Sequence, residues 1–224
     1  MKKGGWSGAL QELFRKYGGR KHPLDHRSPY ELLVMVVLSS QTTDERVNTI
    51  ARGLFAAYPS MKDLALAAPE DLFPHVRTVR SFVKKSRWLI GIGKLLRNEE
   101  NIPRTMDGLT GLPGIGRKSA NVIMSELGVP MEGVIVDLHV LRVAPRLGIA
   151  RGTSPEQIER HLMMKIPQME WRPLGMSLTY LGREICRPEP LCPECVVGAV
   201  CAYYRGRSGG SMPGKSGTVI TPTG

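Results

Sequence analysis

All four cysteines of the chain lie in one short segment near its C-terminal end. They are Cys186, Cys192, Cys195 and Cys201, in the spacing C-x5-C-x2-C-x5-C. A disulfide framework normally spreads its cysteines in order to close long loops, so this clustering indicates a metal centre in a reducing compartment instead. The segment must therefore fold around one compact centre.

Two kinds of metal centre are compatible with four clustered thiols. Structural zinc usually takes two separated C-x2-C pairs, or cysteines together with histidines. Only one C-x2-C pair is present here, and no histidine lies near it in the sequence. An iron–sulfur cluster takes four thiolates from one wrapped loop. The spacing therefore favours a [4Fe–4S] cluster and leaves zinc as the alternative.

The rest of the chain is predicted to be nearly all helix. Three segments carry a helix start signal, a Ser or Thr followed three residues later by Glu or Gln. These capping pairs are Ser28 with Glu31, Thr42 with Glu45, and Ser154 with Gln157. The first is followed by an unbroken apolar run, which is typical of a buried central helix. The one strand-like segment, residues 134–136, is too short to found a sheet.

Size and charge narrow the class of protein. The 224 residues suffice for one large domain or for two small ones that share a cleft. The net charge of +11 is compatible with nucleic acid as a partner, and equally with a solvated basic tail on a mildly basic body.

No membrane span or signal peptide is visible in the sequence, which predicts a cytoplasmic protein. Residues 205–224 are rich in Gly, Ser and Pro, which predicts a flexible tail.

Residues 112–116, LPGIG, predict a tight turn between two helices. Because Gly114 and Gly116 lack a Cβ, an outside group can approach the backbone closely. The first N–H groups of the following helix, and the positive end of its dipole, point to the same place. The turn is thus either an anion site for a DNA phosphate or a plain connection between two packed helices.

Two side chains are candidates for catalysis. Lys118 lies in the first turn of the helix after the LPGIG turn, where the helix N-terminus and Arg117 both favour a neutral amine. A neutral lysine can attack a sugar carbon and form a Schiff base, a prediction that depends on burial of the amine. Asp137 is either an ordinary helix N-cap, contributing about 1 kcal/mol, or a carboxylate that faces a cleft. These two roles are compatible.

These features, in this order, resemble the endonuclease III family of helix-hairpin-helix DNA glycosylases. The resemblance covers about residues 6–204 and is carried by residues 28–44 (SPYELLVMVVLSSQTTD), 112–122 (LPGIGRKSANV), 134–143 (VIVDLHVLRV) and the four cysteines. It implies an all-α fold of two helical domains that flank a DNA-binding cleft. Residues 22–131 would form a six-helix barrel with the helix-hairpin-helix motif. Residues 1–21 and 132–204 would form the iron–sulfur cluster domain.

The resemblance also implies a function, that of a bifunctional glycosylase and AP lyase of base excision repair. Such an enzyme removes oxidised pyrimidines and nicks the strand by β-elimination. Its partner would be double-stranded DNA with damaged bases or abasic sites, and the protein would be a cytoplasmic monomer, nucleoid-associated in a bacterium. The [4Fe–4S] cluster, held by Cys186, Cys192, Cys195 and Cys201, would be mainly structural.

Site residues are carried over by position. Lys118 matches the catalytic lysine of the family and Asp137 its catalytic aspartate. Gln41 matches a loop residue that fills the gap left by the extruded base. The other expected DNA contacts are Arg80, Ser81, Phe82, Leu112, Gly114, Gly116, Arg117 and His139.

The sequence departs from the family at the loop that separates the DNA strands. Ser81 stands where a large apolar wedge is usual, so Arg80 or Phe82 would have to substitute for it.

Two alternative functions stay open. One is a monofunctional mismatch glycosylase, although the adenine type usually lacks a lysine at position 118 and carries a glutamate near residues 39–42. The other is a DNA-binding module with weakened catalysis.

Overall fold

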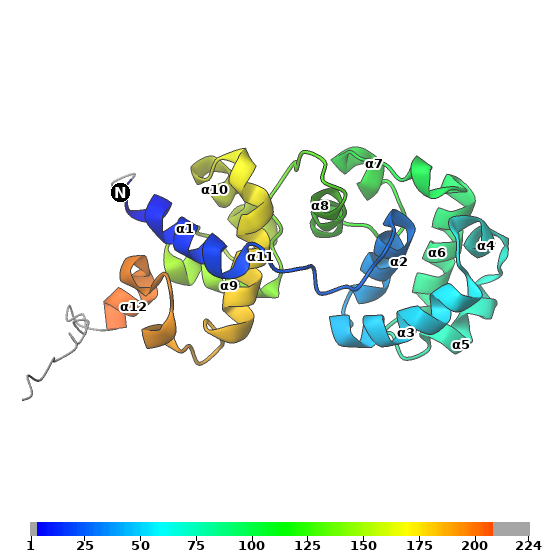
Figure 1. Ribbon diagram of the computed structural model, residues 1–224, viewed down its shortest axis with the longest axis horizontal. Helices are drawn as coiled ribbons and strands as arrows, with labels where there is room; N and C mark the ends of the chain where they lie inside the picture. The colour runs from blue at the N-terminus through cyan, green and yellow to red at the C-terminus, as the bar shows by residue number, and fades with distance from the viewer. Residues whose placement is uncertain (1–3, 208–224) are drawn as a thin grey trace, which may run out of the picture.

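The structure, a computed structural model, describes residues 4–207 of the chain. These residues form α-helices, short 3-10 turns and loops, and none of them forms a strand. The helices gather in two groups along the long axis of the molecule (Figure 1). No helix in this part of the chain is long and apolar enough to cross a membrane. The prediction of an all-α fold is confirmed.

Each group contains both long and short helices. The first group comprises α2 (Pro29–Ser39), α3 (Asp44–Ala57), α4 (Met61–Leu66), α5 (Phe73–Val76), α6 (Phe82–Leu96), α7 (Met106–Thr110) and α8 (Arg117–Glu126). The second comprises α1 (Gly4–Tyr17), α9 (Leu138–Leu147), α10 (Pro155–Lys165), α11 (Trp171–Glu184) and α12 (Ala202–Arg207). The 3-10 turns are η1 (Pro69–Leu72), η2 (Glu99–Asn101), η3 (Gln168–Glu170), η4 (Cys192–Glu194) and η5 (Gly198–Val200).

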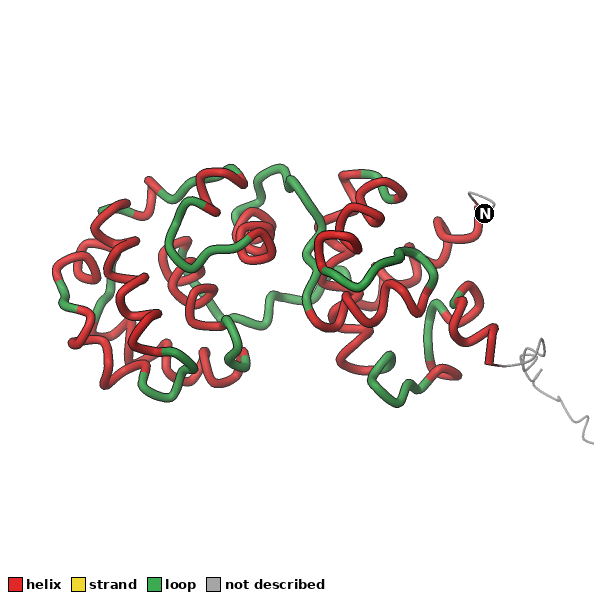
Figure 2. The backbone as a smooth tube through the Cα atoms, turned by 180° about the vertical axis from the view of Figure 1, so that it is seen from behind, coloured by secondary structure: helices red, strands yellow, loops and turns green. Residues whose placement is uncertain are grey.

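The chain passes between the two groups twice. Residues 18–28 lead from α1 to α2, and residues 127–137 lead from α8 to α9, both as loops (Figure 2). The N-terminal helix consequently packs with the C-terminal half of the chain. Helix α1 lies against α11, with Leu13 and Tyr17 buried. The two connecting loops, residues 18–28 and 127–137, can therefore line the space between the two groups of helices.

Helix α2 is the centre of the first group. Ser28 caps it by accepting a hydrogen bond from the backbone N–H of Glu31, and Pro29 is its first residue, as predicted. Residues 32–38 are all buried, because α2 packs against α3, α6 and α8. Burial of each such Leu, Val or Met side chain stabilises the fold by about 1.5–3 kcal/mol. A helix covered on every side is a rigid support for the loop that follows it.

The other two predicted capping pairs have different outcomes. Ser154 and Gln157 form a reciprocal capping box at α10. Helix α3 begins one residue later than predicted, with Thr43 rather than Thr42 as its N-cap. The reason is that the backbone N–H of Thr42 is still bonded to the carbonyl of Ser39 at the end of α2. Helix α3 therefore starts only after the hydrogen-bonded turn of residues 39–42.

The C-terminal boundary also differs from the prediction. The flexible tail is predicted from residue 205, but α12 continues through Arg207. The ring of Tyr203 lies under the guanidinium groups of Arg207 and of Arg146 from α9, at 5.3 and 5.1 Å. Such cation–π contacts anchor the last helix to the fold. The remainder of the predicted tail, residues 208–224, lies outside the described residues.

Helices α7 and α8 form the helix-hairpin-helix, and the two glycines of its LPGIG turn serve different purposes. Gly114 has a positive φ of 78°, and a Cβ there would lie 2.4 Å from the indole ring of Trp88. The group that approaches Gly114 closely is therefore a side chain of the same protein. Gly116 is the N-cap of α8, and a Cβ there would meet nothing within 4 Å. Only Gly116 leaves its side of the turn open to an outside group.

Substitution of Gly114 tests this division of roles. We expect Gly114→Ala to lower the free energy of unfolding by about 1–3 kcal/mol, because the methyl group meets Trp88 and the positive φ is strained for alanine. The matched control is Gly91→Ala in α6, where a Cβ meets nothing; there alanine is expected to raise the free energy of unfolding by up to about 1 kcal/mol. Urea denaturation measures both. Equal effects of the two substitutions would contradict the packing described.

Candidate active site

A cleft of about 960 Å³ lies between the two groups of helices. The first group contributes the loop between α2 and α3 and the N-terminus of α8. The second contributes residues 134–141, the start of α10 and Arg183 of α11. Six of the predicted site residues line it, namely Gln41, Gly116, Arg117, Lys118, Asp137 and His139. The fold thus brings the two catalytic candidates, which are 19 positions apart in the sequence, to one space.

A smaller pocket of about 40 Å³ shares Lys118 and Asp137 with the cleft. His22, from the loop between α1 and α2, and Thr179 of α11 also line it. Burial lowers the pKa of His22 to about 4, so this imidazole is neutral at pH 7. No feature of the sequence singled out His22 or Thr179. Their proximity to the catalytic candidates depends on the loop crossing and on the packing of α11.

Asp137 is both a helix cap and a cleft residue. Its Oδ1 accepts hydrogen bonds from the backbone N–H groups of His139 and Val140, at 2.9 and 2.8 Å, at the start of α9. Its Oδ2 accepts one from the hydroxyl of Thr179, at 3.0 Å. A carboxylate oxygen has two lone pairs, so Oδ2 keeps one for a group in the cleft. The N-cap interpretation and the cleft interpretation of the sequence therefore hold together.

Lys118 is the second residue of α8, at the wall of the cleft. Its side chain is exposed. The burial on which the prediction of a neutral amine depends is therefore absent in the free protein. The first turn of α8 presents its backbone N–H groups and the positive end of the helix dipole beside this amine.

Arg117, a predicted DNA contact, is held by protein groups. Its Nε donates to Oε2 of Glu159 at 2.6 Å, and its Nη2 donates to the carbonyl of Glu132 at 3.0 Å. Glu159, on α10, is buried, and its Oε1 accepts a hydrogen bond from Asn121. A Cβ on Gly133 would lie 1.8 Å from that oxygen. This network joins α8 to α10 across the two groups.

A second ion pair crosses between the groups beside the cleft. Arg183 of α11 donates to Asp44 of α3 at 2.7 Å. Both residues line the large and the small pocket. Like Glu159, they were missed by sequence reasoning, because a charged residue on an amphipathic helix normally indicates nothing more than a solvated face.

The two predicted DNA-inserting loops share an unusual backbone. Gln41 and Ser81 are exposed, and both have positive φ, 57° and 58°. Phe82, one of the two proposed substitutes for a wedge, packs its ring edge-to-face on Phe73 at 5.2 Å. Arg80 is exposed. Of the three predicted contacts in this loop, Arg80 and Ser81 are therefore the exposed ones.

Two more predicted DNA contacts are constrained by the fold. Leu112 is buried, so only the backbone of this residue is available to DNA. His139 is half-buried, and its Nδ1 accepts a hydrogen bond from Arg142 at 3.2 Å. Burial lowers the pKa of His139.

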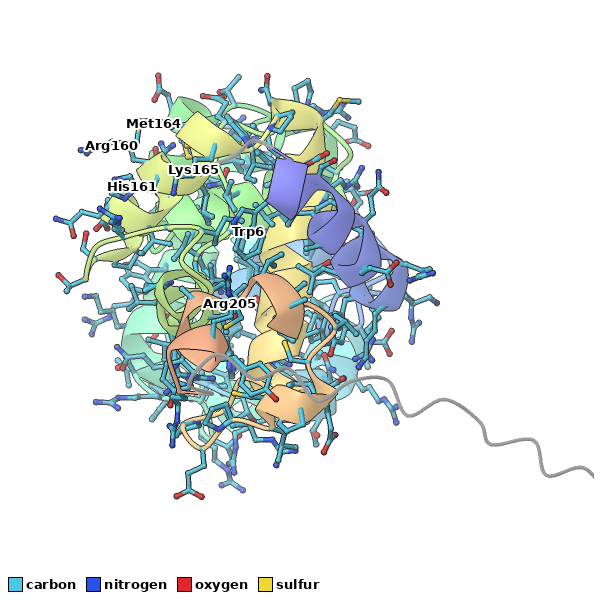
Figure 3. All side chains as sticks on the ribbon, turned by 90° about the vertical axis from the view of Figure 1, so that its left-hand side faces the viewer. Trp6, Arg160, His161, Met164, Lys165 and Arg205 are labelled. Atoms are coloured by element: carbon cyan, nitrogen blue, oxygen red, sulfur yellow. The ribbon has the colours of Figure 1, made fainter. Side chains whose placement is uncertain are left out.

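The positive charge of the protein is spread beyond the cleft. Figure 3 labels several basic side chains on α10 and α12, at the end of the second group and around Trp6 of α1. They are Arg160, His161, Lys165 and Arg205. None of them lines the cleft. Net charge is therefore a weaker guide to the site than the positions of Lys118 and Asp137.

The four cysteines follow α11 in the chain. Cys186 and Cys201 are buried, Cys192 and Cys195 are half-buried, and none forms a disulfide. Two arginines of α9 hold the start of this segment: Arg142 donates to the carbonyl of Cys186 at 3.0 Å, and Arg146 donates to the carbonyls of Arg187 and Pro188.

The chemistry of this donor set fits an iron–sulfur cluster. Burial raises the pKa of the Cys195 thiol to about 11, and the three other thiols add to this rise. As the side chains stand, no three His, Cys, Asp or Glu groups among residues 4–207 converge enough to enclose a metal ion. Four free thiols, with no histidine beside them, match the all-thiolate ligation that such clusters use.

Comparison with known proteins agrees with this geometry. Residues 34–168 match the family model of the HhH-GPD superfamily base excision DNA repair proteins. Endonuclease III of Synechocystis sp. is 36% identical over 192 residues, which covers 84% of this chain and 88% of the relative. Endonuclease III of Thermotoga maritima is 32% identical over 212 residues, which covers 92% and 99%.

Solved structures give the same result. A trapped covalent intermediate of endonuclease III with DNA is 35% identical, with a TM-score of 0.82 over 93% of this chain and 99% of that one. A thermostable thymine-DNA glycosylase, 20% identical with a TM-score of 0.73 over 92% and 97%, has the same fold. The identities and the coverage together establish the family: the chain belongs to the endonuclease III family of the HhH-GPD superfamily, the glycosylases and AP lyases of base excision repair.

Proposed function

We propose that the cleft between the two groups of helices is where this base excision repair glycosylase and AP lyase removes oxidised pyrimidines from double-stranded DNA. The observation that carries the proposal is that Lys118 and Asp137 line both the cleft and the smaller pocket from opposite groups. The two groups would be the two domains, residues 22–131 and residues 1–21 with 132–204. A damaged nucleotide enters the cleft after it is flipped out of the base stack, at a cost of a few kcal/mol.

Lys118 is the nucleophile in this proposal. Its deprotonated Nζ attacks C1′ of the sugar, the bond from C1′ to the base breaks, and the base leaves with a proton. The sugar ring opens to give a Schiff base between Nζ and C1′. Loss of a proton from C2′ then expels the 3′ phosphate, which is β-elimination. A related endonuclease III has been trapped as a covalent intermediate with DNA, which supports a covalent step in this mechanism.

Asp137 supplies the negative charge and the proton acceptor. Its Oδ1 is committed to the helix cap, so the free lone pair of Oδ2 is the one directed to chemistry. A carboxylate there stabilises the cationic sugar and the iminium, and it accepts or returns a proton during ring opening and elimination.

The DNA backbone and the orphaned base are held by other elements. The open side of Gly116 and the N–H groups of α8 bind a phosphate without a side-chain charge. Gln41 fills the gap left by the extruded base, and Arg80 and Ser81 enter from the opposite loop. Because serine is small and polar, extrusion depends less on a wedge in this protein.

A [4Fe–4S] cluster would be held by Cys186, Cys192, Cys195 and Cys201. When bound, the cluster supplies structural cross-linking of the loop. Arg142 and Arg146 transmit that order to α9, the helix whose N-cap is Asp137. The cysteine segment thus supports the catalytic carboxylate from the far end of the same helix.

Borohydride trapping tests the nucleophile. Reduction with borohydride converts a Schiff base into a stable amine, so the wild-type protein should be cross-linked to duplex DNA that contains thymine glycol or an abasic site. Lys118→Ala should abolish the cross-link, whereas Lys62→Ala, an exposed lysine on α4, should leave it unchanged. A wild-type protein that binds duplex DNA but is not cross-linked would favour a DNA-binding module instead.

Asp137→Asn separates the two roles of that carboxylate. The amide oxygen can still accept the two N–H groups of α9, and its NH2 group can donate to Thr179, whose hydroxyl then donates to the carbonyl of Gly175. We expect the free energy of unfolding to change by less than about 1 kcal/mol, and base excision to slow by about 10²–10⁴-fold. Urea denaturation and single-turnover kinetics measure these quantities. Unfolding of the variant, or undiminished excision, would contradict the assignment.

Metal analysis of the purified protein tests the cluster. We expect iron and acid-labile sulfide in equal amounts and no stoichiometric zinc. Cys192→Ala, at a half-buried position, should lower both contents and the stability of the protein. Zinc in place of iron and sulfide would show that the alternative reading of the cysteine spacing is right.

A further inference from the structure

Lys85 of α6 is a buried lysine that the mechanism above does not use. Its side chain is 3% exposed. Its ammonium donates hydrogen bonds to the backbone carbonyls of Leu38, at 2.8 Å, and Ser40, at 2.5 Å. No ion pair joins it to a carboxylate within residues 4–207. Burial lowers its pKa to about 8. Because lysine is almost never fully buried without a partner, this position calls for a physical reason.

The two carbonyls that Lys85 binds terminate α2. The last carbonyls of a helix have no partner within the helix and carry the negative end of its dipole. An ammonium group placed there satisfies them and fixes where the helix ends. The next residue after Ser40 is Gln41, with φ of 57°. Lys85 therefore contacts the backbone immediately before Gln41, the residue that is proposed to fill the gap in the DNA.

Lys85 lies in the first turn of α6, the helix that directly follows the second DNA-inserting loop and has Ser81 as its N-cap. Its N–H donates to the carbonyl of Ser81 at 3.0 Å, and Ser81 has φ of 58°. A left-handed conformation of a non-glycine residue costs on the order of 1–3 kcal/mol and persists only where the surroundings enforce it. Lys85 thus bonds through its side chain to Ser40, the neighbour of the strained residue Gln41. Through its backbone N–H it bonds to the strained residue Ser81.

We propose that Lys85 is a positioning residue that couples the Gln41 loop to the Ser81 loop, so that both enter the duplex together when a nucleotide is extruded. The inference rests on the proposed function, since it assigns both loops to DNA. With no large wedge at position 81, extrusion depends on the fixed spacing of the two loops. Loss of the ammonium should therefore impair extrusion and leave the chemistry at Lys118 intact.

The test compares two substrates that differ in their need for extrusion. Excision of thymine glycol from a duplex requires it, whereas β-elimination at an abasic site in single-stranded DNA does not. Lys85→Met keeps the length of the side chain and removes the charge. We expect the duplex rate to fall by about ten- to a hundredfold, with an unchanged rate on the single strand. Lys94→Met, an exposed lysine on the same helix, is the matched control and should affect neither rate.

Two further variants make the result decisive. Lys85→Gln keeps a donor for one carbonyl, so it should fold even where Lys85→Met does not, and its duplex rate should be intermediate. Gln41→Ala should slow duplex excision in the wild-type background but have little effect in Lys85→Met, because the loop is already misplaced. Equal losses on both substrates, or no loss in either Lys85 variant, would overturn the coupling. A wild-type protein inactive on both substrates would instead overturn the proposed function.

Discussion

The carboxylate of Asp137 carries the constraint on which the rest of the site depends. Because one oxygen caps α9 and the other is bonded to Thr179 of α11, the group cannot rotate away from the cleft. The cap also fixes where α9 begins, and the far end of α9 holds the cysteine segment through Arg142 and Arg146. One helix therefore connects the proposed chemistry to the proposed cluster, and the cysteines can be essential without touching DNA.

The opposite wall of the cleft is held in place by ion pairs as well as by the apolar packing of α8 against α2. Lys118 belongs to α8, and α8 is tied to α10 through Arg117 and the buried Glu159. A second tie, between Asp44 and Arg183, lies beside the same space. Glu159 is the buried member of the first pair, so loss of Arg117 would leave a buried carboxylate with Asn121 as its side-chain partner, whereas the Asp44–Arg183 pair is only partly buried. Both pairs bridge the two groups of helices beside the cleft.

Local sequence signals predicted the fold in detail where the decisive contacts are local. The cap of α2 at Ser28 and the capping box of α10 form as expected, because they depend on residues three positions apart. The prediction failed by one residue at Thr42, where the preceding helix competes for the same backbone N–H. It failed at residues 205–207, where Tyr203 reaches a guanidinium group from α9. Both errors come from partners that lie outside the local window.

The sequence by itself determined the helical class, the family and the identity of the two catalytic candidates, because these follow from residue types at short, fixed spacings. Only the tertiary structure decided what surrounds them. It assigned Gly114 to Trp88 and Arg117 to Glu159, and it packed Phe82 on Phe73. It also buried Lys85 between two loops about 40 residues apart. These pairings lie beyond the three- and four-residue spacings that a helix pattern can reveal, because each contact forms only once the helices have packed against one another.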